Sequence, residues 1–143
     1  MAGESIVVVD SESMVRTVVG VVLEDAGYRV RTTGDFEAGL EMVRSDAPDL
    51  LITNVFLRGI SGHDAILRLR GEFPDMRIMM ASGIPDSQDV QRWMREERFD
   101  AFPKPFTADA LRRKVKQLLR RKKSAGEERK ARRSHSPRTS GAG

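Results

Sequence analysis

Short apolar runs alternate along the chain with segments whose apolar residues have helical spacing. Continuous runs rich in β-branched side chains are typical of strands buried on both faces of a parallel sheet. The second run alternates apolar and polar residues, as an outer strand does, and the fifth contains Pro103, which favours an edge or a strand end. The sequence therefore predicts strands at residues 5–9, 28–32, 50–54, 78–81 and 99–103.

A predicted helix follows each of these strands, because apolar residues recur there at the spacing of one helix face. The second helix is expected from Phe36 to about Asp46. Serine, threonine and aspartate are favoured at helix N-termini, whereas glycine and proline are common where helices end. In the other helices, the residues expected at N-termini are Ser11 or Ser13, Asp86 and Thr107. The residues expected where helices end are Gly27 and Pro74.

Alternation of five strands with five helices predicts an α/β fold with a doubly wound parallel sheet, since right-handed crossovers place helices on both of its faces. The carboxyl ends of all strands then lie along one rim. Polar residues end or follow four of the predicted strands there, namely Asp10 with Ser11, Asn54, Ser82 and Lys104. Open α/β sheets bind ligands at this rim, so these residues form the candidate site.

The central predicted strand lies in the segment PDLLITNVFLRGISG at residues 48–62. A loop bounded by Gly59 and Gly62 follows this strand, and both glycines are expected to allow positive φ. Asn54 is at the tip of the strand. Its amide either takes part in binding or satisfies hydrogen bonds of the loop.

At these positions the chain resembles the receiver domain of two-component response regulators. The resemblance covers about residues 4–121 and depends on five pieces in a fixed order: VVVD at 7–10, PDLLITN at 48–54, GISG at 59–62, MASG at 80–83 and FPKPF at 102–106. It implies a five-stranded flavodoxin-like (βα)5 fold with strand order 2-1-3-4-5. It also implies a signalling module rather than an enzyme.

In that family an Asp at the end of the third strand accepts a phosphoryl group from a histidine kinase, and an acidic pair after the first strand helps to hold Mg²⁺. A Ser or Thr and a Lys contact the phosphoryl oxygens, and the Lys–Pro peptide bond is typically cis. By position, the acceptor falls on Asn54, the acidic pair on Asp10 and Ser11, the hydroxyl on Ser82, the lysine on Lys104 and the cis proline on Pro105.

Two of these positions depart from the family pattern. Asn54 replaces the acceptor carboxylate, and a neutral amide is a far poorer nucleophile than a carboxylate. Ser11 replaces an acid, which leaves Asp10 as the one acid of the pattern, whereas Mg²⁺ prefers charged oxygen ligands. We therefore expect an atypical receiver that is not phosphorylated at residue 54. We also expect no cofactor, at most a weak metal site at Asp10, and an ion pair between Asp10 and Lys104.

Several other residues have ordinary structural interpretations. Ala101 occupies the position where many family members have an aromatic switch residue, and the neighbouring Phe102 is expected to point to the opposite face of the sheet. His63 is expected to be solvated or to cap a helix, and His135 to be unstructured. Trp93 is expected to be half-buried in helix packing.

Charge is concentrated at the C-terminus. From Arg120 to Gly143 there are nine Lys or Arg and two Asp or Glu, a net charge of +7, so residues 1–119 carry −3 of the overall +4. Residues 122–143 lack large apolar side chains and are expected to form a disordered basic tail after a receiver-like domain at 4–121. The absence of cysteine, of a leader sequence and of a long apolar run favours a cytoplasmic protein without membrane segments.

Three functions remain compatible with these features. The leading hypothesis is a signalling module that binds a histidine kinase or a downstream effector through its fourth helix, fifth strand and fifth helix. The alternative is a dock whose basic tail binds nucleic acid. An enzyme with the rim as its cleft is the third, although no nucleophile is paired with a base in the sequence.

Overall fold

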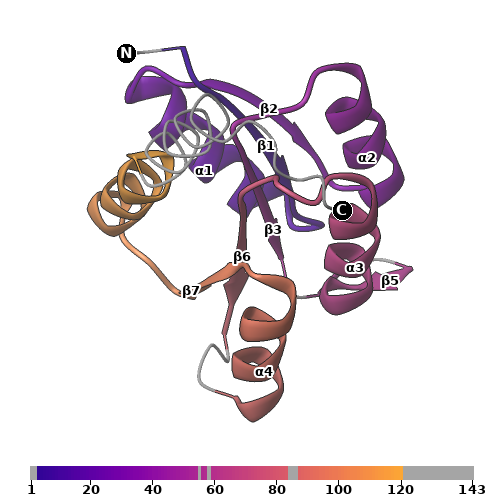
Figure 1. The fold of residues 1–143 in the computed structure, drawn as a ribbon. Coiled ribbons are helices and arrows are strands. Elements are labelled where there is room, and N and C mark those ends of the chain that lie inside the picture. The colour runs from indigo at the N-terminus through magenta and orange to yellow at the C-terminus, as the bar shows by residue number, and fades with distance from the viewer. Residues whose placement is uncertain (1–2, 55, 58, 84–86, 121–143) are drawn as a thin grey trace, which may run out of the picture.

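A five-stranded parallel sheet with the order β2-β1-β3-β6-β7 forms the centre of the molecule (Figure 1). The computed structural model describes residues 3–54, 56–57, 59–83 and 87–120. The strands of the sheet are β1 (Ser5–Val9), β2 (Arg29–Thr33), β3 (Leu50–Asn54), β6 (Ile78–Ser82) and β7 (Asp100–Pro103). Counted in chain order within the sheet, this is the order 2-1-3-4-5, so the predicted doubly wound α/β fold is confirmed.

Helices cover both faces of the sheet. They are α1 (Ser13–Asp25), α2 (Phe36–Ser45), α3 (Gly62–Glu72), α4 (Gln88–Glu97) and a helix from residue 108 to residue 120, the last described residue. α1 and the helix at 108–120 pack on one face, and α2, α3 and α4 pack on the other (Figure 1). Among the described helices, none is long and apolar enough to cross a membrane.

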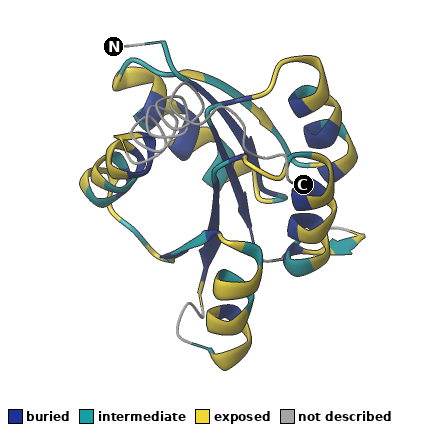
Figure 2. Cartoon of the chain, viewed as in Figure 1, coloured by how far each residue is buried: buried dark blue, intermediate teal, exposed yellow. Residues whose placement is uncertain are grey.

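Alternation along the strands divides the core into two layers. In β1, Val7 and Val9 belong to the layer under α2, α3 and α4, whereas Ile6 and Val8 belong to the layer under α1. Strands β1, β3 and β6 are buried along their whole length, while the helices are buried only on their inner sides (Figure 2). Two-sided burial of the central strands explains why the sequence shows continuous apolar runs there.

The starts of the helices differ in part from the prediction. Thr107 accepts a hydrogen bond from the N–H of Ala110 at 3.0 Å, as expected of a cap. The predicted cap Asp86 lies outside the described residues, and Ser87 caps α4 through the N–H of Val90. Asp35 and Ser61 cap α2 and α3 in the same way.

The predicted serine cap of α1 is wrong. Glu12 occupies the N-cap position and makes no capping hydrogen bond with its side chain. The Oδ1 atom of Asp10 instead accepts the N–H of Glu12 at 2.9 Å, so the rim residue itself orders the entry into α1. At the other end, Gly27 has a φ of 100°, as the prediction of a helix end requires.

A short hairpin, β4 (Phe56–Leu57) and β5 (Ile60–Ser61), lies between β3 and α3 where a loop was predicted. It projects beside the start of α3 (Figure 1). Gly59 in its turn has a φ of +78°, as expected, but Gly62 is the first residue of α3 and does not have a positive φ. Strands of two residues have no detectable periodicity, which is why the sequence did not reveal them.

Arg70 of α3 is buried and fixes the C-terminal end of α4. Its guanidinium donates to the carbonyl oxygens of Glu97 and Arg98, both at 2.9 Å. It also donates to three carbonyl oxygens of the α3–β6 connection, those of Phe73, Pro74 and Met76. Burial lowers the pKa of Arg70, and carbonyls at a helix C-terminus carry partial negative charge that compensates a buried cation.

Candidate functional site

Four adjacent strands of the sheet, β1, β3, β6 and β7, bring the candidate polar residues to one rim. Asp10, Asn54 and Ser82 are buried there, and the side chain of Lys104 is 20% exposed. The backbone N–H of Lys104 donates to the carbonyl oxygen of Ser82 at 2.8 Å, which holds the β7 end against β6. The peptide bond between Lys104 and Pro105 is cis, as the resemblance implies.

Asp10 is the centre of the polar contacts at this rim. Its Oδ1 accepts the side-chain amide of Asn54 at 3.3 Å, in addition to the N–H of Glu12. Its Oδ2 forms the predicted ion pair with the Nζ of Lys104, also at 3.3 Å. A buried carboxylate that is paired and hydrogen-bonded at both oxygens is held in one orientation.

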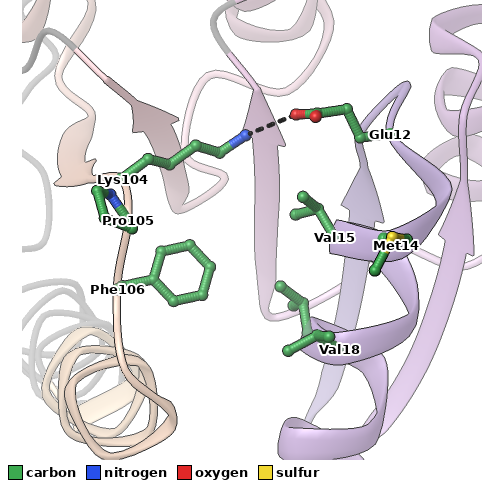
Figure 3. A pocket seen from close by; sticks show the side chains of 8 residues that line it. Glu12, Met14, Val15, Val18, Lys104, Pro105 and Phe106 are labelled. Atoms are coloured by element: carbon green, nitrogen blue, oxygen red, sulfur yellow. Dashed lines mark ion pairs between the residues drawn. The ribbon is translucent and has the colours of Figure 1, made fainter.

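Glu12 contributes a second carboxylate that the sequence analysis missed. Its Oε1 lies 3.5 Å from the Nζ of Lys104 (Figure 3). Glu12 lies outside the two positions of the acidic pair, Asp10 and Ser11, so the family pattern does not point to it. The side chain of Glu12 is 64% exposed, so this contact is weaker than that with the buried Asp10.

The residues at the rim do not fit the Mg²⁺ ion that the family implies. Both oxygens of Asp10 already accept or pair with positively polarised groups. Asn54 directs its amide nitrogen, a donor, towards Asp10, and Glu12 extends towards Lys104. Within the described ranges, no group of three His, Cys, Asp or Glu side chains is placed to hold a metal ion.

The residues at the switch position lie as strand alternation predicts. Ala101 packs in the layer under α2, α3 and α4, and Phe102 packs in the layer on the other face. The Phe102 ring contacts that of Phe106 at a centroid distance of 5.2 Å. A buried aromatic on that face cannot take the place of an aromatic residue at position 101.

His63 is half-buried and does not cap α3, because Ser61 occupies the N-cap position, so the predicted capping role is wrong. Its imidazole stacks on the indole of Trp93, with ring centroids 4.1 Å apart and an interplanar angle of 6°. Its Nε2 is buried and has no hydrogen-bond partner among the described residues. The contact joins the start of α3 to α4, and Trp93 is half-buried as predicted. His135 and the predicted tail lie outside the described residues.

The chain matches a known family over most of its length. Residues 6–116 match the family model described as the response regulator receiver domain. The transcriptional regulatory protein CseB of Streptomyces coelicolor is 31% identical over 118 residues, which cover 82% of this chain and 50% of CseB. The nitrogen assimilation regulatory protein NtrX of Azorhizobium caulinodans is 29% identical over 108 residues, covering 74% of this chain and 24% of NtrX. The chain thus spans about a quarter to a half of the length of these curated relatives.

Solved structures agree with this match. A crystal structure of NtrX from Brucella abortus with ADP superimposes with a TM-score of 0.86 at 28% identity, covering 98% of this chain and 31% of that one. A receiver domain protein of Methanospirillum hungatei has a TM-score of 0.80 at 21% identity, covering 87% of this chain and 99% of that one. At that lower identity, the second likeness supports the fold alone.

Proposed function

The chain belongs to the response regulator receiver domain family, and we propose that this member signals without accepting a phosphoryl group at residue 54. Receiver domains are signalling modules that interact with histidine kinases and effectors. In this chain, binding of a partner protein would carry the signal, and phosphorylation would not.

The amide of Asn54 is the observation that carries the proposal. Asn54 lies at the end of β3, where the family acceptor would be, and its nitrogen donates to Oδ1 of Asp10. Attack on phosphorus requires an anionic or activated nucleophile, and a hydrogen-bonded neutral amide is neither. The contacts of Asp10 also disfavour Mg²⁺, which would have to displace Lys104 and the amide to reach the carboxylate.

Phosphorylation of the whole chain tests this proposal directly. The protein is incubated with acetyl phosphate and Mg²⁺, and peptide mass mapping locates any phosphoryl group. We expect none at residue 54. The matched control is Asn54→Asp combined with Ser11→Asp, which restores the two carboxylates of the family pattern. We expect that variant to gain both Mg²⁺ binding and a labile acyl phosphate. A phosphoryl group mapped to residue 54 of the unchanged protein contradicts the proposal.

The face formed by α4, β7 and the helix at 108–120 is the proposed site for a partner protein. Val90 is the only buried residue of α4, and Trp93 and Met94 are partly buried, so the outer side of this helix is open to solvent. Arg95 and Glu96 are exposed on it. Affinity capture with the whole chain and with an Arg95→Glu, Glu96→Arg variant checks the face. If the unchanged chain and the variant capture the same partners equally well, this face is not the binding site.

Nucleic-acid binding is a second candidate, favoured by the charge of the C-terminal helix. The described part of this helix contains five Lys or Arg and one Asp, and Arg113, Lys116 and Arg120 are exposed. The basic residues 121–143 follow directly. Binding through these groups should weaken steeply with salt and disappear when residues 120–143 are deleted. Binding that is independent of salt, or none, rejects this candidate.

A further inference from the structure

The stack of His63 on Trp93 joins the first turn of α3 to the middle of α4. The two rings are nearly parallel, with an interplanar angle of 6° and centroids 4.1 Å apart. The Nε2 atom of the imidazole is buried there and has no hydrogen-bond partner among the described residues. Because buried polar atoms are rarely left without a partner, this nitrogen needs a physical explanation.

The surroundings of the imidazole favour its neutral form. A neutral ring can carry its proton on Nδ1 and leave only a lone pair at Nε2, whereas an imidazolium has an N–H group at both nitrogens. In the stack, that second N–H would be a buried, charged donor without an acceptor. His63 is also the second residue of α3, and the partial positive charge of a helix N-terminus opposes a cation. Attraction between a cation and the indole face acts in the other direction, but it is smaller than the cost of burying an unpaired charge.

The charged groups around the stack do not supply the missing acceptor. On α3, the exposed Asp64 follows the histidine. On α4, three carboxylates lie within about one turn of the tryptophan, those of Asp89, Glu96 and Glu97. Asp89 pairs with Arg92 at 3.3 Å, and none of these groups is a partner of Nε2. The described residues of the β4–β5 hairpin carry no charge. A protonated ring is therefore better accommodated outside the stack, where water reaches its N–H groups.

The position of α4 depends on this contact. The helix has few apolar anchors, because Val90 is its buried residue and Trp93 and Met94 are only partly buried against the core. Its C-terminal end is held separately by Arg70, which donates to two carbonyl oxygens there. Loss of the stack would release the middle of α4 while its C-terminal end stays fixed.

We propose that His63 and Trp93 form a proton-sensitive latch between α3 and α4. The latch is closed while the imidazole is neutral, and it opens when Nε2 gains a proton. Histidine side chains change charge between about pH 5 and pH 8, so acidification within this range releases α4. The opening itself does not depend on the proposed function. Its consequence rests on that function, because α4 belongs to the face proposed for a partner protein and the latch would make partner binding sensitive to pH.

Fluorescence reports the state of the latch directly, because Trp93 is the only tryptophan of the chain. The whole protein is titrated from about pH 8 to about pH 5, and quenching by acrylamide measures how accessible the indole is. On acidification, we expect the emission maximum to shift to longer wavelength and the indole to lose protection from acrylamide. Both changes should reverse when the pH is raised again.

Two matched variants assign the change to one side chain. His63→Phe keeps a ring that stacks but cannot take a proton, so its indole should stay protected over the whole range. If this variant does not fold, His63→Leu replaces it, since leucine also packs on the indole and does not titrate. His135→Gln changes the other of the two histidines in the chain and should leave the titration as it is in the unchanged protein. Far-UV circular dichroism at each pH distinguishes opening of the latch from unfolding.

Four results would overturn the proposal. The accessibility of Trp93 might stay constant over the titration, change equally in the variant at residue 63, or lose its change in His135→Gln. Acidification might also protect the indole further, as a dominant attraction between imidazolium and indole would require. None of these results affects the phosphorylation assay, which concerns residue 54, so failure of the latch and failure of the proposed function are distinguishable.

Discussion

Single side chains decide the chemistry of the rim. At the end of β3, Asn54 has an amide that donates a hydrogen bond to Oδ1 of Asp10. The other oxygen of Asp10, Oδ2, forms an ion pair with the Nζ of Lys104. On the proposed function, the amide of Asn54 therefore decides what Asp10 and Lys104 contact.

Arg70 is predicted to be the most important polar side chain for stability. Arg70→Met should destabilise the protein by roughly 3 kcal/mol, because several buried carbonyl oxygens lose their donor at once. Thermal or urea unfolding measures the loss. Arg68→Met is the control two residues away, since Arg68 makes an exposed ion pair with Glu37 and should change stability by less than about 1 kcal/mol. Equal losses of stability in Arg70→Met and Arg68→Met would show that the buried contacts of Arg70 contribute no more than an exposed ion pair.

The ion pairs between α2 and α3 predict a pH effect. Hydrogen bonding to Arg44 lowers the pKa of Glu72 below its ordinary value of 4.5. A carboxyl whose folded pKa is depressed stabilises the protein above its unfolded pKa, and this contribution is lost as the pH falls through the folded value. Glu72→Gln should therefore lower the melting temperature at neutral pH, and the difference from the unchanged protein should shrink below pH 4.5. A difference that grows on acidification would contradict the assignment.

At the scale of elements, α4 has fewer buried residues than α1, α2 or α3, so its N-cap is expected to contribute a larger share of its stability. Ser87→Ala removes the hydrogen bond to the N–H of Val90 and should cost about 1 kcal/mol. Hydrogen exchange of residues 88–97 should speed up more than exchange in α2. Ser13→Ala is the control, because no side chain caps α1, and its effect should be close to zero.

Helices and strands with strong periodicity could be predicted from the sequence. Side-chain contacts between two such elements could not. The five strands of the sheet follow from apolar runs, their order was implied by the resemblance to receiver domains, and Gly27 and Thr107 were recognised by residue type. The stack of His63 on Trp93 depends on α3 lying beside α4, which no local pattern reports. Arg70 resembles any exposed basic residue of a helix until the α4 terminus is placed against it.

The same distinction explains the candidate site. Because the carboxyl ends of parallel strands share a rim, the sequence predicted that Asp10, Asn54 and Lys104 lie close together. In the structure, Asp10 contacts both of the other side chains. Glu12 was missed because its role depends on the direction of a flexible side chain just before α1.

At the scale of the whole molecule, residues 4–121 are predicted to fold without the remainder of the chain. Both core layers are complete within the described residues, and the last buried side chain is Leu119. A protein ending at residue 121 should keep the melting temperature of the whole chain within about 2 °C, since the removed segment lacks apolar side chains to bury. Scanning calorimetry of the two proteins measures this. A larger loss would place part of the tail in the folded structure.

The contact between Asn54 and Asp10 also has a consequence for how quickly the output of this protein could be changed. Reversible modification lets a regulator be reset within the lifetime of each molecule, but a side-chain arrangement completed during folding has nothing to reset. On the proposed function, every copy is competent from the moment it leaves the ribosome. The strength of the output would then follow synthesis and proteolysis, and the cell would adjust the dose of this protein rather than its state.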